Sequence, residues 1–417
     1  MANIYSADKA NSIYIDPVSH NNQRCEFRLD NKGSYYLPNF QLLNLGAVTS
    51  GPIGYSKING VKALIKNIYL YDGKTEISSL RDVPLWSGWK SIQNKNSYSN
   101  NILVNLDASR IGNNSTYHNK ISRVIPAPSA TTDALSTGKG MTPLQEMLPF
   151  LRAVSVVPQS VMPNLRLVIE WNSNALEVTS ADNVGVGVVI EPILRVDVIN
   201  DESGADMVKE AMAQYSSPVS WEEIEKDEFF LSEGGAAASA EISVNKKING
   251  FNSKSVRNIL MVKQLATEGN AFAANAAIGY GNLGSHGWFR GKYNIRINGQ
   301  PVYPQDGMVG DNERLAQLCD TWGDIVTVPF GNSQAQVSFG VEGDLFETAS
   351  QGVMGQTDYV GMSVKQKVVD MQIEMKRTTL SNNSVYRPES SPMRMHVFGE
   401  VQKSLIVENG DYNIVYV

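Results

Sequence analysis

The stretch Ala63–Tyr71, ALIKNIYLY, reads as a buried β-strand, and the tripeptide Ile58–Gly60 leads into it. Ile248–Gly250, again Ile-Asn-Gly, leads into Val256–Lys263, VRNILMVK, where a basic residue is again followed by Asn-Ile. The offset between the two stretches is close to half of the 417-residue chain. A repeat on this scale predicts one β-rich domain written twice, with the two strands at equivalent places.

The composition is that of a globular protein, with 42% hydrophobic and 19% charged residues, so long disordered stretches are not expected. The net charge of −6 is spread over both signs without a Lys/Arg run, which gives no reason to expect a nucleic-acid surface. Cys25 and Cys319 fall in different halves, so a reducing compartment is the simpler interpretation. The N-terminus lacks the pattern of a signal peptide, and the apolar runs are too short to span a bilayer.

Two hairpins are predicted from turn residues. Asp72-Gly73 joins the first stretch to Lys74–Ile77, and Asn298-Gly299 joins Tyr293–Ile297 to Gln300–Tyr303. Asp-Gly and Asn-Gly favour the tight turns that connect antiparallel strands.

Many further segments have the composition of strands. They are Cys25–Leu29, Phe40–Val48, Leu165–Trp171, Val184–Ile199 with a break at Pro192, Glu241–Ile248, Ile325–Val328, Gln336–Gly340, Val364–Arg377, Met393–Val407 and Tyr412–Val417. The last of these is apolar to its end, which predicts that it is held in a sheet.

Helical patterns are few. One is predicted from Thr142 to Pro149, with Thr142 as N-cap and Pro143 in the first turn, and others over Ala205–Gln214 and Asp311–Trp322. The polar connector before Ser216–Ser220 predicts a boundary there, with one domain over residues 1–217 and a second over residues 218–417.

The histidines show no metal-binding pattern. His20, His118, His286 and His396 all lie more than four residues apart, whereas metal ligands are usually closely spaced. His396 lies in a strand-like run and is expected to be a packed or edge residue. The sequence therefore predicts no metal site.

Catalytic motifs are also missing. No Gly-x-Ser-x-Gly elbow occurs, and the glycines of Gly279–Gly287 lack the lysine of a phosphate loop. The pairs Glu222-Glu223 and Asp227-Glu228 would point to opposite faces of a strand, which favours a solvated acidic strand over an acid–base pair. We therefore expect no catalytic or cofactor-binding residue, and no enzyme.

Trp86 and Trp89 leave two interpretations open. They would form either an exposed aromatic platform or one packed face of a short helix, and their three-residue spacing favours the packed face.

The order of segments resembles that of double jelly-roll major capsid proteins of small DNA viruses, particularly the virophage and Polinton-like group. Five stretches carry the resemblance, at matching places along most of the chain. They are Ala63–Gly73 (ALIKNIYLYDG), Leu148–Trp171, Pro192–Val198 (PILRVDV), which looks like the strand that closes the first barrel, Lys247–Lys263 and Arg314–Asp324.

The resemblance implies an all-β fold of two tandem eight-stranded jelly-roll β-sandwiches with a few short helices in connecting loops. It also implies a non-enzymatic major capsid protein whose homotrimers form pseudo-hexameric capsomers of an icosahedral virion, assembled inside the host cell. Its partners would be neighbouring capsomers, penton and minor capsid proteins, with no cofactor. The long polar segments Ser91–Ser122, Ala127–Gly140, Ala266–Gly291 and Gly340–Gly361 would supply outward towers and subunit contacts, and Ala2–Pro17 an arm beneath the shell.

Three other classes remain open at this point. A minor or vertex capsid protein would usually carry one jelly roll. A carbohydrate-binding β-sandwich protein should show a signal peptide and clustered exposed aromatics. A cupin-like enzyme would need clustered metal ligands.

Overall fold

The computed structural model describes thirteen segments of the chain. They are residues 10–30, 32–49, 61–92, 140–172, 186–200, 212–231, 241–265, 292–303, 308–309, 320–321, 359–378, 393–408 and 411–417.

The first half forms two antiparallel sheets that face each other across an apolar core. One contains β1 (Asn11–Ile15), β4 (Tyr35–Tyr36), β5 (Gln41–Leu45), β9 (Gly140–Pro143), β10 (Val157–Pro158) and β13 (Ile193–Ile199). The other contains, in spatial order, β2 (Ser19–His20), β3 (Arg24–Arg28), β11 (Leu165–Trp171), β7 (Ile65–Asp72) and β8 (Thr75–Arg81). A separate pair consists of β6 (Ala47–Thr49) and β12 (Val186–Val189). We call this half the first barrel.

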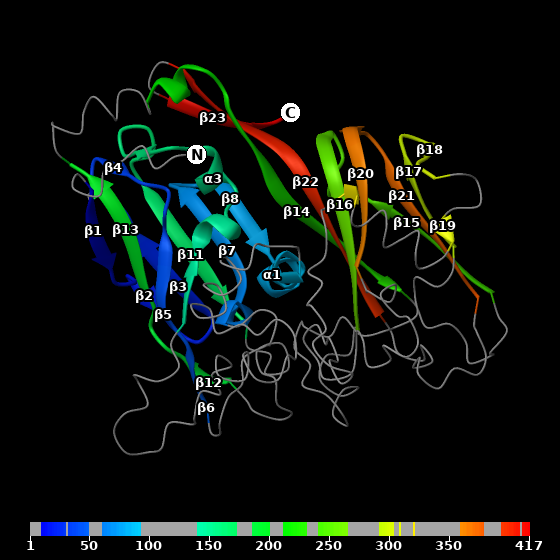
Figure 1. The fold of residues 1–417 in the computed structure, drawn as a ribbon, viewed down its shortest axis with the longest axis horizontal. Helices are drawn as coiled ribbons and strands as arrows, with labels where there is room; N and C mark the ends of the chain where they lie inside the picture. Colours follow the sequence, from blue (N-terminus) through cyan, green and yellow to red (C-terminus); the bar gives the residue numbers. More distant parts are fainter. Residues whose placement is uncertain are drawn as a thin grey trace, which may run out of the picture.

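The second half, which we call the second barrel, repeats the arrangement. One sheet contains, in order, β14 (Val219–Leu231), β22 (Met393–Glu408), β16 (Lys254–Leu265) and β20 (Tyr359–Val368), and β23 (Asp411–Tyr416) also pairs with β22. The other contains β15 (Glu241–Ile248), β21 (Met371–Thr378), β17 (Lys292–Ile297) and β18 (Gln300–Pro301), and β19 (Met308–Val309) also pairs with β17. The two barrels lie side by side in Figure 1.

The two barrels share one strand order. The run β1-β13-β5-β9 corresponds to β14-β22-β16-β20, and the run β3-β11-β7-β8 corresponds to β15-β21-β17-β18. In both, the first strand pairs with the last, as when a long hairpin is rolled into a two-sheet sandwich. The described strands thus form two jelly rolls of eight principal strands each, and the predicted fold class is confirmed.

The prediction that the two Ile-Asn-Gly stretches lead into equivalent strands is wrong. β7 corresponds to β17 and not to β16, so the stretches Ala63–Tyr71 and Val256–Lys263 occupy different places in their barrels. The true equivalents are the hairpins β7–β8 and β17–β18, each with a glycine of positive φ, Gly73 at 56° and Gly299 at 79°. Both hairpins were predicted from their turn residues. Residues 58–60 lie outside the described part of the chain.

The helices are short, as expected. They are the 3-10 helices η2 (Val61–Leu64), η4 (Leu144–Glu146) and η6 (Gln214–Ser216), and the α-helices α1 (Val83–Ile92) and α3 (Phe150–Ala153). The prediction of Thr142 as an N-cap is wrong, because Thr142 lies within strand β9, where it pairs with Leu42, and Pro143 is the residue that precedes the helix. None of the helices in the described residues is long and apolar enough to cross a bilayer.

Several other predictions can be compared with the strands. Pro192 does separate β12 from β13. The segment Val364–Arg377 was expected to be a single strand, but it contains parts of two strands, β20 and β21. The arm expected over Ala2–Pro17 is wrong for residues 11–15, because they form β1 and pair with β13 in the first barrel. Asp311–Trp322 lies outside the described residues except 320–321, as do most of the four long polar segments.

Each barrel has its own apolar core, but the first core extends beyond residue 217. It includes Trp221 and Ile224 of β14, Leu260 of β16, and Phe398 and Leu405 of β22. The second core is built around Phe251 and the inner faces of its two sheets. The predicted boundary at residues 217 and 218 falls immediately before β14 and stays a prediction.

Candidate functional site

The most elaborate arrangement of side chains in the described residues lies where the two barrels meet. Here β8, α1 and α3 of the first barrel pack against β14, β16 and β22 of the second, and we call this contact the barrel joint. In Figure 1, α1 lies between the barrels, and β14 and β22 rise beside it. Aromatic pairs hold its apolar part, with ring centroids 5.7 Å apart for Trp86 and Phe398 and 5.2 Å apart for Phe150 and Trp221.

Strand β22 has two buried faces, which explains how one strand serves both barrels. Successive side chains of a strand point to opposite sides. Val397 and Val401 belong to the second core, whereas Phe398 belongs to the core that continues into the first barrel. Both faces of the strand are therefore covered, as expected for a strand between two packed layers.

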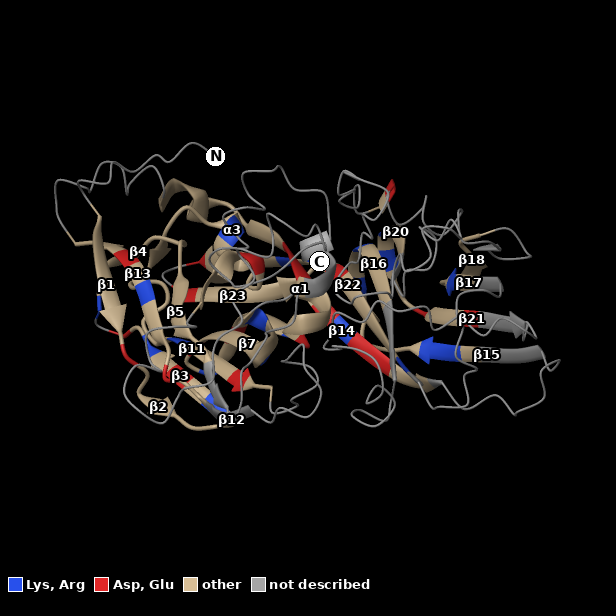
Figure 2. Ribbon diagram, turned by 60° about the horizontal axis from the view of Figure 1, so that its bottom comes forward, with Lys and Arg blue, Asp and Glu red and all other residues tan. Residues whose placement is uncertain are grey.

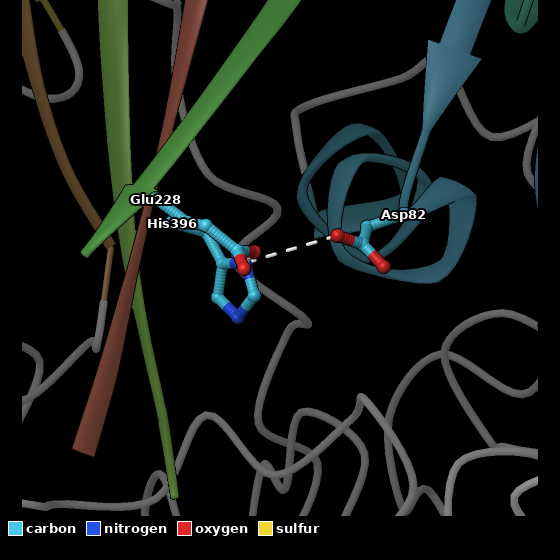
Figure 3. A group of neighbouring side chains, drawn as sticks. All are labelled: Asp82, Glu228 and His396. Carbon is cyan, nitrogen blue, oxygen red and sulfur yellow. Dashed lines mark ion pairs between the residues drawn. The ribbon is translucent and has the colours of Figure 1, made fainter. Parts of the chain in front are cut away.

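A buried ion-pair network lies in the barrel joint around Asp82, which is in the link between β8 and α1 (Figure 3). The ammonium group of Lys226 contacts the carboxylate of Asp82 directly, and it lies 2.7 Å from Glu228. Lys66 lies 2.7 Å from Asp82 on the other side. Nδ1 of His396 lies 3.8 Å from Asp82 and 3.5 Å from Glu228.

Burial and the neighbouring ammonium groups act in opposite directions on the pKa of Asp82 and in the same direction on the pKa of His396. Burial raises the pKa of Asp82, but Lys226, Lys66 and His396 outweigh it and hold the pKa at about 2. Burial lowers the pKa of His396 well below its usual 6.5, and the charge of Lys226 lowers it further. At neutral pH the network therefore consists of an ionised Asp82, two ammonium groups and a neutral imidazole.

The same residues bring ligand atoms close enough for a metal ion. One atom each from Asp82, Glu228 and His396 lie within 4.8 Å of one another. However, Lys226 donates to both carboxylates, so a cation already occupies the position between them. The arrangement fits an ion-pair network between barrels better than a metal site.

Glu223 of β14 forms the second polar centre of the barrel joint. Its Oε1 accepts hydrogen bonds of 3.0 Å from the hydroxyl of Ser78 and from the backbone N–H of Ser79, both in β8. Its Oε2 accepts one of 2.6 Å from Nε1 of Trp221, and Nζ of Lys403 lies 4.0 Å away. Burial raises the pKa of Glu223 to about 7, although Lys403 and the three donors lower it.

Lys403 completes this centre by binding the same strand. Its ammonium group donates a 3.0 Å hydrogen bond to the carbonyl of Ile77, which is the unpaired residue of a β-bulge between β7 and β8. β8 is the edge strand of its sheet among the described residues. Glu223 accepts hydrogen bonds from this edge, and Lys403 donates one to it. The two side chains therefore bind the edge of β8 in place of a neighbouring strand.

The C-terminal strand β23 also contacts both barrels. The hydroxyl of Tyr412 donates a 2.8 Å hydrogen bond to Asp72 at the tip of the first barrel, and that of Tyr416 donates a 2.6 Å bond to Glu225 of β14. Ile414 packs against the first core. The prediction that the C-terminal segment is held in a sheet is confirmed.

The sequence-based interpretation of the acidic strand was partly wrong. The side chain of Glu223 is only 1% exposed, whereas the side chains of Glu222 and Glu228 are 40% and 42% exposed. Trp86 is buried in α1, so the packed interpretation is right for it, and the side chain of Trp89 is not described. His396 is a packed residue, as expected, while His118 and His286 lie outside the described residues.

His20 lies apart from the barrel joint. It is in β2, with its ring 6.2 Å from that of Trp171 in an edge-on arrangement. Elsewhere the charged residues of both signs are interspersed over the strands of both barrels, as Figure 2 shows.

Comparison of the sequence with family models and with curated proteins finds no match. Solved structures do share the fold over nearly the whole chain. The capsid of the virus PBCV-1 matches with a TM-score of 0.60 at 13% identity, covering 98% of this chain and 96% of that chain. The mavirus major capsid protein matches with a TM-score of 0.54 at 11% identity, covering 97% and 90%, and the Faustovirus major capsid protein with 0.51 at 10% identity, covering 96% and 90%.

At these identities the likeness is one of fold. Together with the repeated strand order, it shows that the chain has the double jelly-roll fold found in these viral major capsid proteins.

Proposed function

We propose that this protein is a major capsid protein, located in the virion, whose homotrimers form pseudo-hexameric capsomers of an icosahedral shell. The observation that carries the proposal is the repeat of one eight-strand order within a single chain, in a fold that matches viral major capsid proteins over 96–98% of its length. Two similar barrels give a trimer six similar sides, so a three-fold particle can occupy a six-fold lattice position.

The barrel joint supports this proposal. A subunit that must present two barrels at a constant spacing needs a contact that does not bend. The described contact combines aromatic packing with buried ion pairs, which are costly to break once one partner is removed. A flexible linker between independent domains would have shown neither feature.

Neighbouring capsomers, penton proteins and minor capsid proteins are the partners that the proposal implies. The interspersed charges of the described strands suit such contacts, since large surfaces of one sign would repel between identical subunits. The protein would act as a structural component and not as an enzyme.

The proposal can be tested by the mass of the purified chain in solution and by electron microscopy. We expect a stable trimer of the 45.7-kDa chain that forms hexagonal arrays as concentration is raised. A stable monomer that binds glycans on a glycan array would contradict the proposal and favour the carbohydrate-binding alternative. A pentamer would favour a vertex protein.

A further inference from the structure

We propose that the barrel joint is proton-sensitive, and that protonation of Glu223 sets its strength. This inference concerns the chain itself and holds whatever the protein assembles into.

The geometry makes Glu223 the group through which a proton can act on both barrels. Its carboxylate comes from β14 of the second barrel, yet Ser78 and the backbone of Ser79 in the first barrel bind it. Only 1% of its side chain is exposed, and Lys403, its nearest cation, is 3% exposed and bonded to the same strand. A change in the charge of Glu223 is therefore felt directly by the contact with β8.

Charged or titratable groups from several strands lie around this centre and the neighbouring ring of Tyr416. They are Glu76 from β8, Glu225 from β14, Lys403 from β22, Tyr416 from β23 and Lys254 from β16, the last with its ammonium group 4.4 Å from the ring of Tyr416. Lys403 also lies 5.4 Å from that ring. Lys403 is the cation nearest to the carboxylate, and desolvation outweighs its attraction.

The direction of the effect follows from linkage. The pKa of Glu223 is raised from 4.5 to about 7 in the folded protein, so the folded state binds more protons than the unfolded chain between these values. The stabilisation is present in full below pH 4.5 and is lost as the pH rises through about 7. His396 acts in the opposite direction, because its lowered pKa makes acidification below 6.5 destabilising. Between pH 4.5 and 6.5 the two contributions oppose each other, so the stability of the barrel joint should change little there and should fall as the pH rises through about 7.

The test is urea unfolding of the full chain at a series of pH values, for the wild type and for Glu223→Gln. The ratio of their unfolding equilibrium constants should change by up to about tenfold per pH unit between pH 4.5 and about 7, and should be constant below and above this range. Glu222→Gln is the matched control, because Glu222 is the adjacent residue but its side chain is 40% exposed and directed to Arg257. A pH-independent ratio for Glu223→Gln would overturn the proposal.

A second measurement does not depend on the folding of that variant. Infrared spectroscopy of the wild type should detect a buried protonated carboxyl group that titrates close to pH 7. Ser78→Ala removes one donor to the ionised carboxylate and should shift this titration to higher pH. Glu400→Gln should leave the band in place, since Glu400 lies elsewhere in the joint, bonded to Asn258. Absence of the band, or no shift in Ser78→Ala, would rule out Glu223 as the proton-binding group.

Discussion

Gly399 of β22 lies directly against the ring of Phe251, so closely that a Cβ atom at this position would be 2.5 Å from Cε1 of the ring. Phe251 is fully buried in the second core and cannot move aside without displacing its neighbours. We therefore expect Gly399→Ala to lower the free energy of unfolding by about 1–3 kcal/mol, measured by urea unfolding.

A second substitution checks this cause. In a Phe251→Leu background the smaller side chain leaves room for the added methyl group, so Gly399→Ala should cost clearly less there. An unchanged cost would mean that strand propensity, and not the contact with the ring, is responsible.

Removing the central cation of the barrel joint should be severe. Lys226→Met leaves Asp82 buried with one ammonium partner fewer, and we expect a loss of about 3–5 kcal/mol in the free energy of unfolding. Lys247→Met is the matched control, because Lys247 pairs with Asp370 through a side chain that is 57% exposed, and it should change stability little. Equal losses for the two variants would argue against the joint as a major source of stability.

Acid should weaken the same network. The pKa of Asp82 is held at about 2, below its usual 3.8, so its stabilisation is present above 3.8 and is lost as the pH falls through about 2. The stability difference between the wild type and Asp82→Asn, measured by thermal unfolding, should therefore shrink between these two pH values. A difference that stays constant over this range would show that the charge of Asp82 does not contribute.

The second hairpin should depend on its glycine. Gly299 has a φ of 79°, and a Cβ there meets no atom within 4 Å, so only backbone strain opposes a side chain. Gly299→Ala should cost about 1–2 kcal/mol. Gln300→Ala, at the next and exposed position, should change the free energy of unfolding by less than about 0.5 kcal/mol. Similar effects of both would contradict the assignment of the cost to φ.

These hairpins show what the sequence can predict. Asp72-Gly73 and Asn298-Gly299 are local signals, since the conformation of a tight turn depends on its own residues. Asn249-Gly250 is also an Asn-Gly pair, but it does not form a tight hairpin turn of this kind. The carboxylate of Asp227 accepts hydrogen bonds from the backbone N–H groups of both residues. The short motif therefore did not mark equivalent strands, although the inference of a duplicated β-domain was right.

The barrel joint could not be predicted from local patterns. Asp82, Glu223 and the pair His396 and Lys403 come from three separate segments, the link between β8 and α1, β14 and β22, and only the tertiary fold brings them together. One signal was present in the acidic strand, where Trp221 and Ile224 flank Glu223 and are themselves buried. A strand that is apolar on both sides of a carboxylate is covered on both faces, and its charge then needs partners from another element.

The cover that the second barrel provides for β8 also has a consequence for biosynthesis. The strands of the first barrel are complete once Ile199 has left the ribosome, but Glu223 and especially Lys403 emerge later. If the first barrel folds in this interval, the edge of β8 is exposed without the side chains of Glu223 and Lys403 that later bind it. Translation of β22 thus ends a period in which newly made chains are open to pairing with one another, and slowing translation between the two barrels should increase aggregation of the newly made protein.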